Sequence, residues 1–342
     1  MKTVATFGEI MLRLSPPDKE RLFQSPALTA FFGGAEANVA VSLALFGHET
    51  RFISVVPDND IGAAAGRELR KYGVRTDHIV RRGRRLGIYF AVPGANQRPS
   101  EVIYDREHSA IADIGKGAID WSLALAGVQW LHLTGITPAI SRAAAEQTMI
   151  AVRTARTRGI TVSVDLNYRG KLWKYGMEAP EVMGEIFKRA DIGIANEEDC
   201  QKSLGIAAET ALPAAGLDIA TYERLTARVM EKFPNLKKMA VTLRESRSAE
   251  HNIWSGGLRN ATEFIAGPRF AIEDIVDRIG SGDAFAAGLI HGFDLFSSDQ
   301  EALEFALAAS CLKHSIPGDF NLITEDEALA LMKGDKTGRI KR

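Results

Sequence analysis

The stretch DRIGSGDAFAAG, residues 277–288, places small residues and one carboxylate at the start of an apolar helical run. Gly280, Ser281 and Gly282 precede a helix that we expect to begin near Asp283, so free backbone N–H groups and the positive end of the helix dipole meet there. Such a turn can hold an anion and stabilise a phosphoryl group in transfer. Asp283 could then take the proton of an attacking hydroxyl. Alternatively, Ser281 or Asp283 simply caps the helix, which explains the spacing without any catalytic role.

A second candidate is the stretch FFGGAEANVAVSLALFG, residues 31–47. Gly33 and Gly34 precede an expected helix, and Glu36 and Asn38 fall in its first turn. A double glycine lets a polar ligand approach the backbone beside Asn38. The alternative is a loop-to-helix junction with tight packing, which the small residues also fit.

The stretch VDLNYRGKLW, residues 164–173, is a hydrophobic strand that ends in polar residues, including Asp165 and Arg169. In parallel sheets, ligands bind at the carboxyl ends of strands. Arg169 could form a forked contact with a carboxylate or phosphate, or it could be an ordinary exposed arginine.

Another strand end, ANEEDC at residues 195–200, gathers three acidic residues after Asn196. Clustered carboxylates could hold Mg²⁺ through water. The alternative is a helix N-terminus that is rich in acids and capped by Asn196.

Several common sites are absent from the sequence. It contains no GxxxxGK[ST], no HExxH, no GxSxG and no GxGxxG. These absences exclude a Walker-type phosphate loop and make a metalloprotease, a serine hydrolase or a hydride-transfer enzyme poor hypotheses.

The composition points to neither nucleic acid nor a membrane as partner. Of 342 residues, 46% are hydrophobic and 25% charged, and the formal net charge is −1. A charged substrate must therefore be recognised by local groups. Cys200 and Cys311 stand far apart with no CxxC partner, so we expect no disulfide and a cytoplasmic location. The first apolar stretch is broken by Gly8, Glu9 and Arg13, which predicts a strand rather than a signal peptide.

Strand-like and helical segments alternate through most of the chain, which predicts βαβ units and a mostly parallel sheet covered on both faces. The expected strands are residues 3–9, 50–56, 128–135, 160–167, 192–199 and 238–244. The expected helices are residues 36–47, 62–73, 141–159 and 180–190, and we expect the last third to be mainly helical.

Residues 84–110 interrupt this alternation with a hairpin pattern, and a second extended piece begins at Ile10. We expect these pieces to form a small β-sheet lid from residues 10–33 and 87–111. The α/β core would then comprise residues 1–9, 34–86 and 112–334, followed by a polar tail at 335–342. Because exposed sheet edges and apolar faces tend to be covered, we expect a homodimer through this lid.

Three stretches in this order resemble the PfkB/ribokinase family of carbohydrate kinases. DRIGSGDAFAAG is similar to the family's C-terminal signature, GGAEANVAVSLALFG to its N-terminal signature, and NEED to its N-x-x-E motif. The resemblance implies a ribokinase-like three-layer α/β/α core with a small β lid, ATP as phosphoryl donor and Mg²⁺ as cofactor. It also implies that Asp283 is the general base and that the backbone of residues 280–282 forms an anion hole.

Within the family, the chain is most similar to the kinases of 2-keto-3-deoxygluconate, through FGEIMLRLSPP, GIYF, VIYDR, LTGIT, NYRGKLW and VDRIGSGD. This similarity implies a sugar-acid site formed by Gly33, Gly34, Asn38, Tyr89, Tyr104, Arg106, Ile136 and Arg169. It implies nucleotide contacts from Asn196, Thr242, Glu245, Gly280 and Gly282, and a magnesium ion held through water by Asp199. The chain departs from the family pattern at Arg278-Ile279, at Asp199 and in VTLRESRSAEHNIWSG, residues 241–256.

The resulting hypothesis is an ATP-dependent kinase that phosphorylates a primary hydroxyl of 2-keto-3-deoxygluconate. Arg106 and Arg169 would orient the acid, because an acidic substrate on a nearly neutral protein needs local cations. Tyr89 and Tyr104 on the hairpin would close over the substrate. The alternatives are a fructokinase or another sugar kinase, and a sugar-acid-binding protein without catalytic activity.

Overall fold

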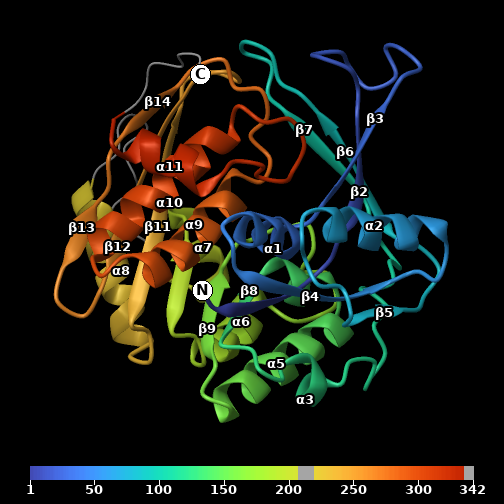
Figure 1. The fold of residues 1–342 in the computed structure, drawn as a ribbon, viewed down its shortest axis with the longest axis horizontal. Helices are drawn as coiled ribbons and strands as arrows, with labels where there is room; N and C mark the ends of the chain where they lie inside the picture. The colour runs from blue at the N-terminus through green and yellow to red at the C-terminus, as the bar shows by residue number, and fades with distance from the viewer. Residues whose placement is uncertain (207–218, 335–342) are drawn as a thin grey trace.

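The main element of the computed structural model, which describes residues 1–206 and 219–334, is a ten-stranded sheet (Figure 1). Its strands, in spatial order, are β13 (Phe264–Ala266), β12 (Asn252–Arg259), β11 (Lys238–Ser246), β10 (Ile192–Ala195), β9 (Thr161–Asp165), β8 (Trp130–Thr134), β1 (Thr3–Phe7), β4 (Glu49–Val56) and β5 (Ile79–Arg81), with β14 (Phe270–Ile272) paired to β12. The strands from β11 to β5 pair in parallel, whereas β12 pairs antiparallel with β11, β13 and β14. The carboxyl ends of the parallel strands therefore meet along one edge.

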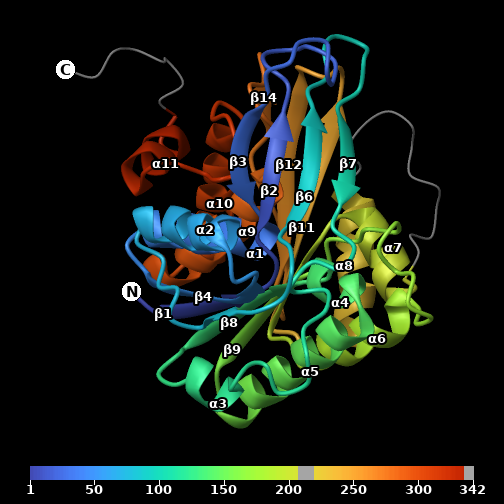
Figure 2. The same cartoon turned by 90° about the vertical axis from the view of Figure 1, so that its right-hand side faces the viewer.

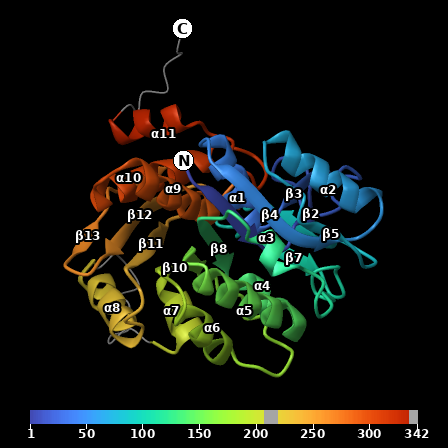
Figure 3. The ribbon, with the colours of Figure 1, turned by 60° about the horizontal axis from the view of Figure 1, so that its bottom comes forward.

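Helices cover both faces of this sheet (Figure 3). One layer contains α3 (Trp121–Ala124), α4 (Ile136–Ile140), α5 (Arg142–Thr157), α6 (Ala179–Phe187), α7 (Glu197–Leu204) and α8 (Ile219–Lys232). The other contains α1 (Ala35–Leu45), α2 (Asp60–Lys71), α9 (Ser281–Leu295), α10 (Asp299–Lys313) and α11 (Glu325–Met332). The expected three-layer α/β architecture is confirmed, and the fully buried strand β8 fits a strand covered on both faces.

Each strand and helix that the alternation predicts is present within a few residues at its ends, except the strand expected at 192–199. It ends at Ala195, because residues 197–199 begin α7. The last third contains the helices α9, α10 and α11, and the strand expected at 238–244 is β11, but no expected strand corresponds to β12, β13 or β14 within 252–272. The helix expected near Asp283 begins at Ser281, with Gly280 as its N-cap. The two residues that we placed before this helix, Ser281 and Gly282, are therefore part of its first turn.

A separate four-stranded sheet stands beside the core (Figure 2). It consists of β3 (Thr29–Gly33), β2 (Met11–Ser15), β6 (Gly87–Val92) and β7 (Glu101–Asp105) in this order. β2 and β6 are parallel, and the other pairs are antiparallel. All four strands lie in residues 10–33 and 87–111, and we call them the lid sheet. The polar tail expected at 335–342 lies outside the described residues.

In the described part of the chain, no helix is long and apolar enough to cross a membrane.

Candidate active site

A pocket of about 1010 Å³ lies where the carboxyl ends of β9 and β10, the N-terminus of α9 and the lid sheet come together. Most of the site residues predicted from the sequence line it: Gly34, Asn38, Tyr89, Tyr104, Ile136, Arg169, Asn196, Asp199, Thr242, Gly280, Ser281, Gly282 and Asp283. Gly33, Arg106 and Glu245 do not line it. The fold thus brings together residues from widely separated stretches of the sequence, from Gly34 to Asp283.

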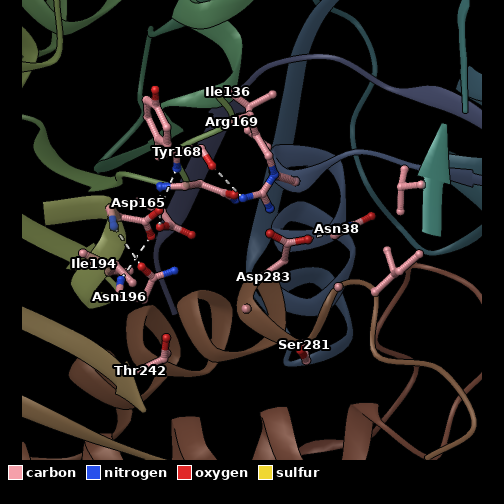
Figure 4. A pocket seen from close by; sticks show the side chains of 18 of the residues that line it. Asn38, Ile136, Asp165, Tyr168, Arg169, Ile194, Asn196, Thr242, Ser281 and Asp283 are labelled. Atoms are coloured by element: carbon pink, nitrogen blue, oxygen red, sulfur yellow. Dashed lines mark hydrogen bonds between the residues drawn. The ribbon is translucent and has the colours of Figure 1, made fainter. Parts of the chain in front are cut away.

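Asp283 lies in the first turn of α9, 8% exposed, and accepts a hydrogen bond from Asn38 Nδ2 at 2.7 Å (Figure 4). Burial raises the pKa of Asp283 to about 7, although the Asn38 hydrogen bond and nearby Arg169 act in the opposite direction. A carboxyl group that titrates near neutrality suits a general base. The capping alternative is wrong here, because Gly280 is the N-cap and no side chain caps the helix.

The turn before Asp283 is held in an unusual conformation. Gly280 has φ of 84°, and a Cβ there would lie 2.1 Å from the carbonyl oxygen of Asp319. Asp277 fixes the turn because its carboxylate accepts hydrogen bonds from the N–H groups of Ile279 and Gly318, both at 3.0 Å. Only glycine fits position 280, both for its backbone angle and for the space.

Not every N–H group of this turn is free. The N–H of Ser281 donates to the carbonyl of Arg278 at 3.3 Å. Within the described chain, the N–H groups of Gly280, Gly282 and Asp283 have no acceptor. An anion at this helix end could therefore accept hydrogen bonds from the N–H groups of Gly280, Gly282 and Asp283.

The double glycine at the start of α1 serves packing and the orientation of Asn38. Gly34 is the N-cap, and its N–H donates to Asn38 Oδ1 at 3.2 Å. This bond orients the Asn38 amide so that its Nδ2 faces Asp283. Gly33 lies instead against the side chain of Asp319, where a Cβ would be 2.1 Å from Oδ2. Its small size thus serves contact with Asp319 and not the wall of the pocket.

Glu36, beside Asn38 in the sequence, is buried and ties two elements together. Its Oε1 accepts hydrogen bonds from the hydroxyl groups of Thr134 at 2.7 Å and Thr137 at 2.8 Å. These bonds join α1 to the end of β8 and the start of α4, where Ile136 enters the pocket. Glu36 is thus a positioning residue for the pocket wall.

Asp165 ends β9 at the floor of the pocket and is buried. Burial raises its pKa well above the usual range, the carboxylates of Asp199 and Asp283 add to this rise, and Arg169 opposes it. One N–H of the Arg169 guanidinium donates a hydrogen bond to the carbonyl of its neighbour Tyr168, at 2.9 Å. Figure 4 shows its guanidinium directed toward Asp283. Arg169 is therefore a cation that faces the pocket from the strand side.

Asn196 and Asp199 form a capping box at the start of α7. Asn196 Oδ1 accepts from the Asp199 N–H at 2.9 Å, and Asp199 Oδ2 accepts from the Asn196 N–H at 3.1 Å. The other oxygen of Asp199 accepts from the N–H of Tyr168 at 2.8 Å. The helix-cap alternative is thus confirmed for this motif.

The same pocket edge presents oxygen ligands for a hard cation. Asp165, Asn196, Glu198 and Asp199 all line it. Among the described residues, no group of three or more His, Cys, Asp or Glu side chains is placed to hold a metal directly. Carboxylate and amide oxygens around a wide polar pocket fit a magnesium ion bound through water and phosphate oxygens.

Two predicted residues lie outside the pocket for clear physical reasons. Arg106 is buried in an ion pair with Glu9, which also accepts a hydrogen bond from Ser109 Oγ at 2.6 Å. Glu245 lies between Arg247 and Arg269, each at 3.5 Å. Side chains alternate along β11. Because Arg244 faces the pocket, the side chain of Glu245 points away from it.

The lid sheet is connected to the turn of α9 through a buried ion cluster. Arg13 on β2 pairs with Asp277 at 2.7 Å and with Asp319 at 3.1 Å, and all three side chains are at most 10% exposed. The hydroxyl of Tyr89 on β6 also donates to Asp319. Through Arg13, the lid sheet therefore contacts Asp277, the aspartate that fixes the glycine turn.

Sequence reasoning assigned no role to several residues that line the pocket: Asp165, Tyr168, Lys171, Lys202, Arg244, Trp254, Arg278 and Asp319. Some left a signal. Residues 242 and 244 share one face of a strand, so the assignment of Thr242 could have led to Arg244. Asp319 left none, since it lies in a loop between two helices.

Over almost its whole length the chain is similar to known carbohydrate kinases. The crystal structure of the 2-dehydro-3-deoxygluconokinase from Thermotoga maritima superimposes with a TM-score of 0.93 at 45% identity, covering 98% of this chain and 100% of that one. The 2-dehydro-3-deoxygalactonokinase of Haloferax volcanii is 29% identical over 335 residues, 98% of each protein. The 2-dehydro-3-deoxygluconokinase of Bacillus subtilis is 27% identical over 331 residues, 95% of this chain and 93% of that protein. The model of the pfkB family carbohydrate kinases matches residues 1–322, and with its ribokinase-like fold the chain belongs to this family.

Proposed function

We propose that this carbohydrate kinase transfers the terminal phosphoryl group of ATP to a primary hydroxyl of 2-keto-3-deoxygluconate. The observation that carries the proposal is the placement of Asp283 and Arg169 in one pocket, beside a helix N-terminus with free N–H groups. These parts suit an acidic substrate with a hydroxyl to be deprotonated. The names of the relatives from Thermotoga maritima and Bacillus subtilis support the same substrate.

In the proposed reaction, Asp283 accepts the proton as the hydroxyl oxygen attacks the terminal phosphorus, and ADP leaves. The Asn38 hydrogen bond keeps the carboxylate oriented toward the pocket. The N–H groups of Gly280 and Gly282 stabilise the charge on the phosphoryl oxygens. Arg169 orients the sugar acid through its carboxylate. Asp199 and Asn196 would hold magnesium through water, and the bound ion would supply charge neutralisation on the phosphates.

The proposal includes further contacts to the sugar acid and to the nucleotide. We propose that Tyr89, Tyr104 and Ile136 contact the sugar acid and that Thr242 contacts the nucleotide, because all four line the pocket. Arg106 can reach the carboxylate of the acid only if it leaves Glu9, and Glu245 can reach the nucleotide only if its strand turns.

The direct experiment is a phosphorylation assay of the purified protein with ATP, Mg²⁺ and a set of acceptors. We expect rapid transfer to 2-keto-3-deoxygluconate and slower transfer to fructose and ribose. The 2-keto-3-deoxygalactonate epimer belongs in the set because the Haloferax volcanii relative is named for it. Transfer to fructose alone would contradict the substrate, and no ATP consumption with any acceptor would favour a binding protein.

We also propose a homodimer through the outer face of the lid sheet, in a cytoplasmic enzyme. Strand alternation and register place Leu14, Phe90 and Ile103 on the face opposite the pocket, and the ring of Phe23 packs on Phe90. Phe23 is 66% exposed and Ile103 42%, so this apolar face lacks a cover within the described chain. Light scattering should give twice the chain mass, and Phe90→Asp should give the monomer mass.

A further inference from the structure

Two arginines that the proposed reaction does not use face the pocket near the glycine turn. Arg244 extends from β11, and Arg278 lies two residues before Gly280. Both line the same pocket as Asp283 and Arg169.

Neither arginine is neutralised within the described chain. Arg244 is exposed to the pocket and forms no hydrogen bond or ion pair there. Arg278 donates one hydrogen bond, to the carbonyl of Ala249 at 2.6 Å, and forms no ion pair. Its acidic neighbour, Asp277, is already committed to Arg13 at 2.7 Å and to two backbone N–H groups. Most of the donors on the two guanidinium groups therefore remain for a ligand.

Both guanidinium groups are positive charges that line one pocket. Partial burial lowers the pKa of Arg244, and the positive charges of Arg278 and Arg169 lower it further. Burial also lowers the pKa of Arg278. Like charges that converge on a pocket raise the free energy of the empty protein, and an anion bound between them removes this cost.

We propose that Arg244 and Arg278 form a clamp for the phosphate chain of the phosphoryl donor. This inference deepens the proposed function, since it names the residues that would hold the donor's phosphates. The clamp lies on the β11 side of the pocket, next to the N–H groups of Gly280 and Gly282. Arginine forks match phosphate oxygens and carry the charge that a polyphosphate requires.

The clamp also touches the lid sheet through one backbone residue. The carbonyl of Ala249 accepts from Arg278, and its N–H donates to the carbonyl of Asn96 at 2.9 Å. Asn96 lies in the turn between β6 and β7. A single residue, Ala249, thus links Arg278 to the hairpin that carries Tyr89 and Tyr104.

The test is the binding of inorganic tripolyphosphate to the full chain by titration calorimetry, without sugar acid, adenine or divalent cations. We expect Arg244→Gln and Arg278→Gln each to weaken this binding about 10- to 100-fold, as expected for the loss of charge-assisted hydrogen bonds. The matched control is Arg247→Gln, on the same hairpin but paired with Glu245 outside the pocket. It should bind tripolyphosphate like the parent.

Kinetic constants provide a second readout. Both Gln variants should raise the KM for ATP while leaving the KM for the sugar acid unchanged. The side chain of Arg244 forms no hydrogen bond or ion pair within the described chain, so Arg244→Gln should fold like the parent. Arg278→Lys replaces Arg278→Gln if the latter unfolds.

Two results would overturn the clamp: tripolyphosphate binding within twofold of the parent in both Gln variants, or a rise in KM confined to the sugar acid. Failure of the proposed function looks different. If the parent binds tripolyphosphate but phosphorylates no sugar acid, the clamp stands and the acceptor is wrong.

Discussion

Asn38 Nδ2 lies 2.7 Å from Asp283 Oδ2, so residues 245 positions apart join the first turns of α1 and α9. The same amide receives a hydrogen bond from the N–H of Gly34 through its Oδ1. The Asn38 side chain is therefore oriented from one side and donates to Asp283 on the other. Gly34, at the start of α1, thus acts through Asn38 on the carboxylate in the first turn of α9.

Replacement of Asp283 by asparagine removes the proton acceptor but keeps the shape of the side chain. We expect Asp283→Asn to lower kcat by roughly 10²–10⁴ while ADP still binds, because general-base help contributes in this range. Steady-state kinetics and ADP titration measure the two effects. Asp326→Asn, an exposed aspartate on α11, is the control and should keep the parent's kcat. Full activity of Asp283→Asn would contradict the assigned role.

The pH dependence of activity and of stability should have opposite signs at Asp283. Its pKa of about 7 predicts that kcat/KM rises with pH through this value, as the carboxylate forms. In contrast, the raised pKa stabilises the fold below the unfolded value of 3.8, and this contribution is lost as pH rises through about 7. The difference between the unfolded pKa of 3.8 and the folded pKa of about 7 corresponds to about 4 kcal/mol of unfolding free energy. Thermal unfolding at pH 5 and pH 8 should therefore show Asp283→Asn gaining Tm over the parent at the higher pH, and an equal difference at both values would contradict the shift.

Arg169→Ala should separate the acid from the nucleotide. The only side-chain hydrogen bond of Arg169 in the described chain is to the carbonyl of Tyr168, so loss of the side chain should leave the fold intact. We expect the KM for the sugar acid to rise about tenfold or more, and that for ATP to stay nearly constant, because a charge-assisted hydrogen bond to the carboxylate disappears. Arg153→Ala, exposed on α5, is the matched control. Equal increases in both KM values would place Arg169 on the phosphates instead.

The sequence predicted the core of the fold because its signals are local. The central strands are continuous apolar runs, and the helices between them show the spacing of a buried face. A helix cap at Asn196 is one of two alternatives that residue type and position offer, and the capping box is present. By comparison, β12, β13 and β14 left weak signals, since two of them have three residues each and β12 contains a Ser-Gly-Gly run.

Side-chain partners across the fold could not be predicted in the same way. The ion pair between Glu9 and Arg106 spans 97 positions, and the pair of Arg13 with Asp319 spans 306. Nothing in the spacing of these residues links them. The sequence alone therefore could not indicate that Arg106 would be paired with Glu9 rather than open to the pocket.

The buried ion cluster between lid and core should be costly to break. Arg13→Met leaves the carboxylates of Asp277 and Asp319 buried without their cation, and removal of one partner from a buried pair costs about 3–5 kcal/mol. Arg75→Met is the matched control, because Arg75 is 49% exposed and pairs with Glu49 and Asp77 at the surface. It should lower the unfolding free energy by about 0–1 kcal/mol. Urea unfolding of both variants measures the difference, and similar losses would mean that the Arg13 cluster is not a lid anchor.

Two glycines in the same turn should respond oppositely to an added methyl group. Gly280→Ala forces an alanine to φ of 84° and places its Cβ 2.1 Å from the carbonyl oxygen of Asp319. We expect this variant to lose about 2 kcal/mol or more of unfolding free energy, from backbone strain and displacement of the loop. Gly282→Ala should gain up to about 1 kcal/mol, because position 282 is helical and a Cβ there meets no atom within 4 Å. Urea unfolding of the pair needs no substrate, so it tests the geometry of the turn apart from catalysis. Equal stability of the two variants would mean that the turn adopts another conformation in solution, and the N–H groups assigned to the phosphoryl oxygens would then point elsewhere.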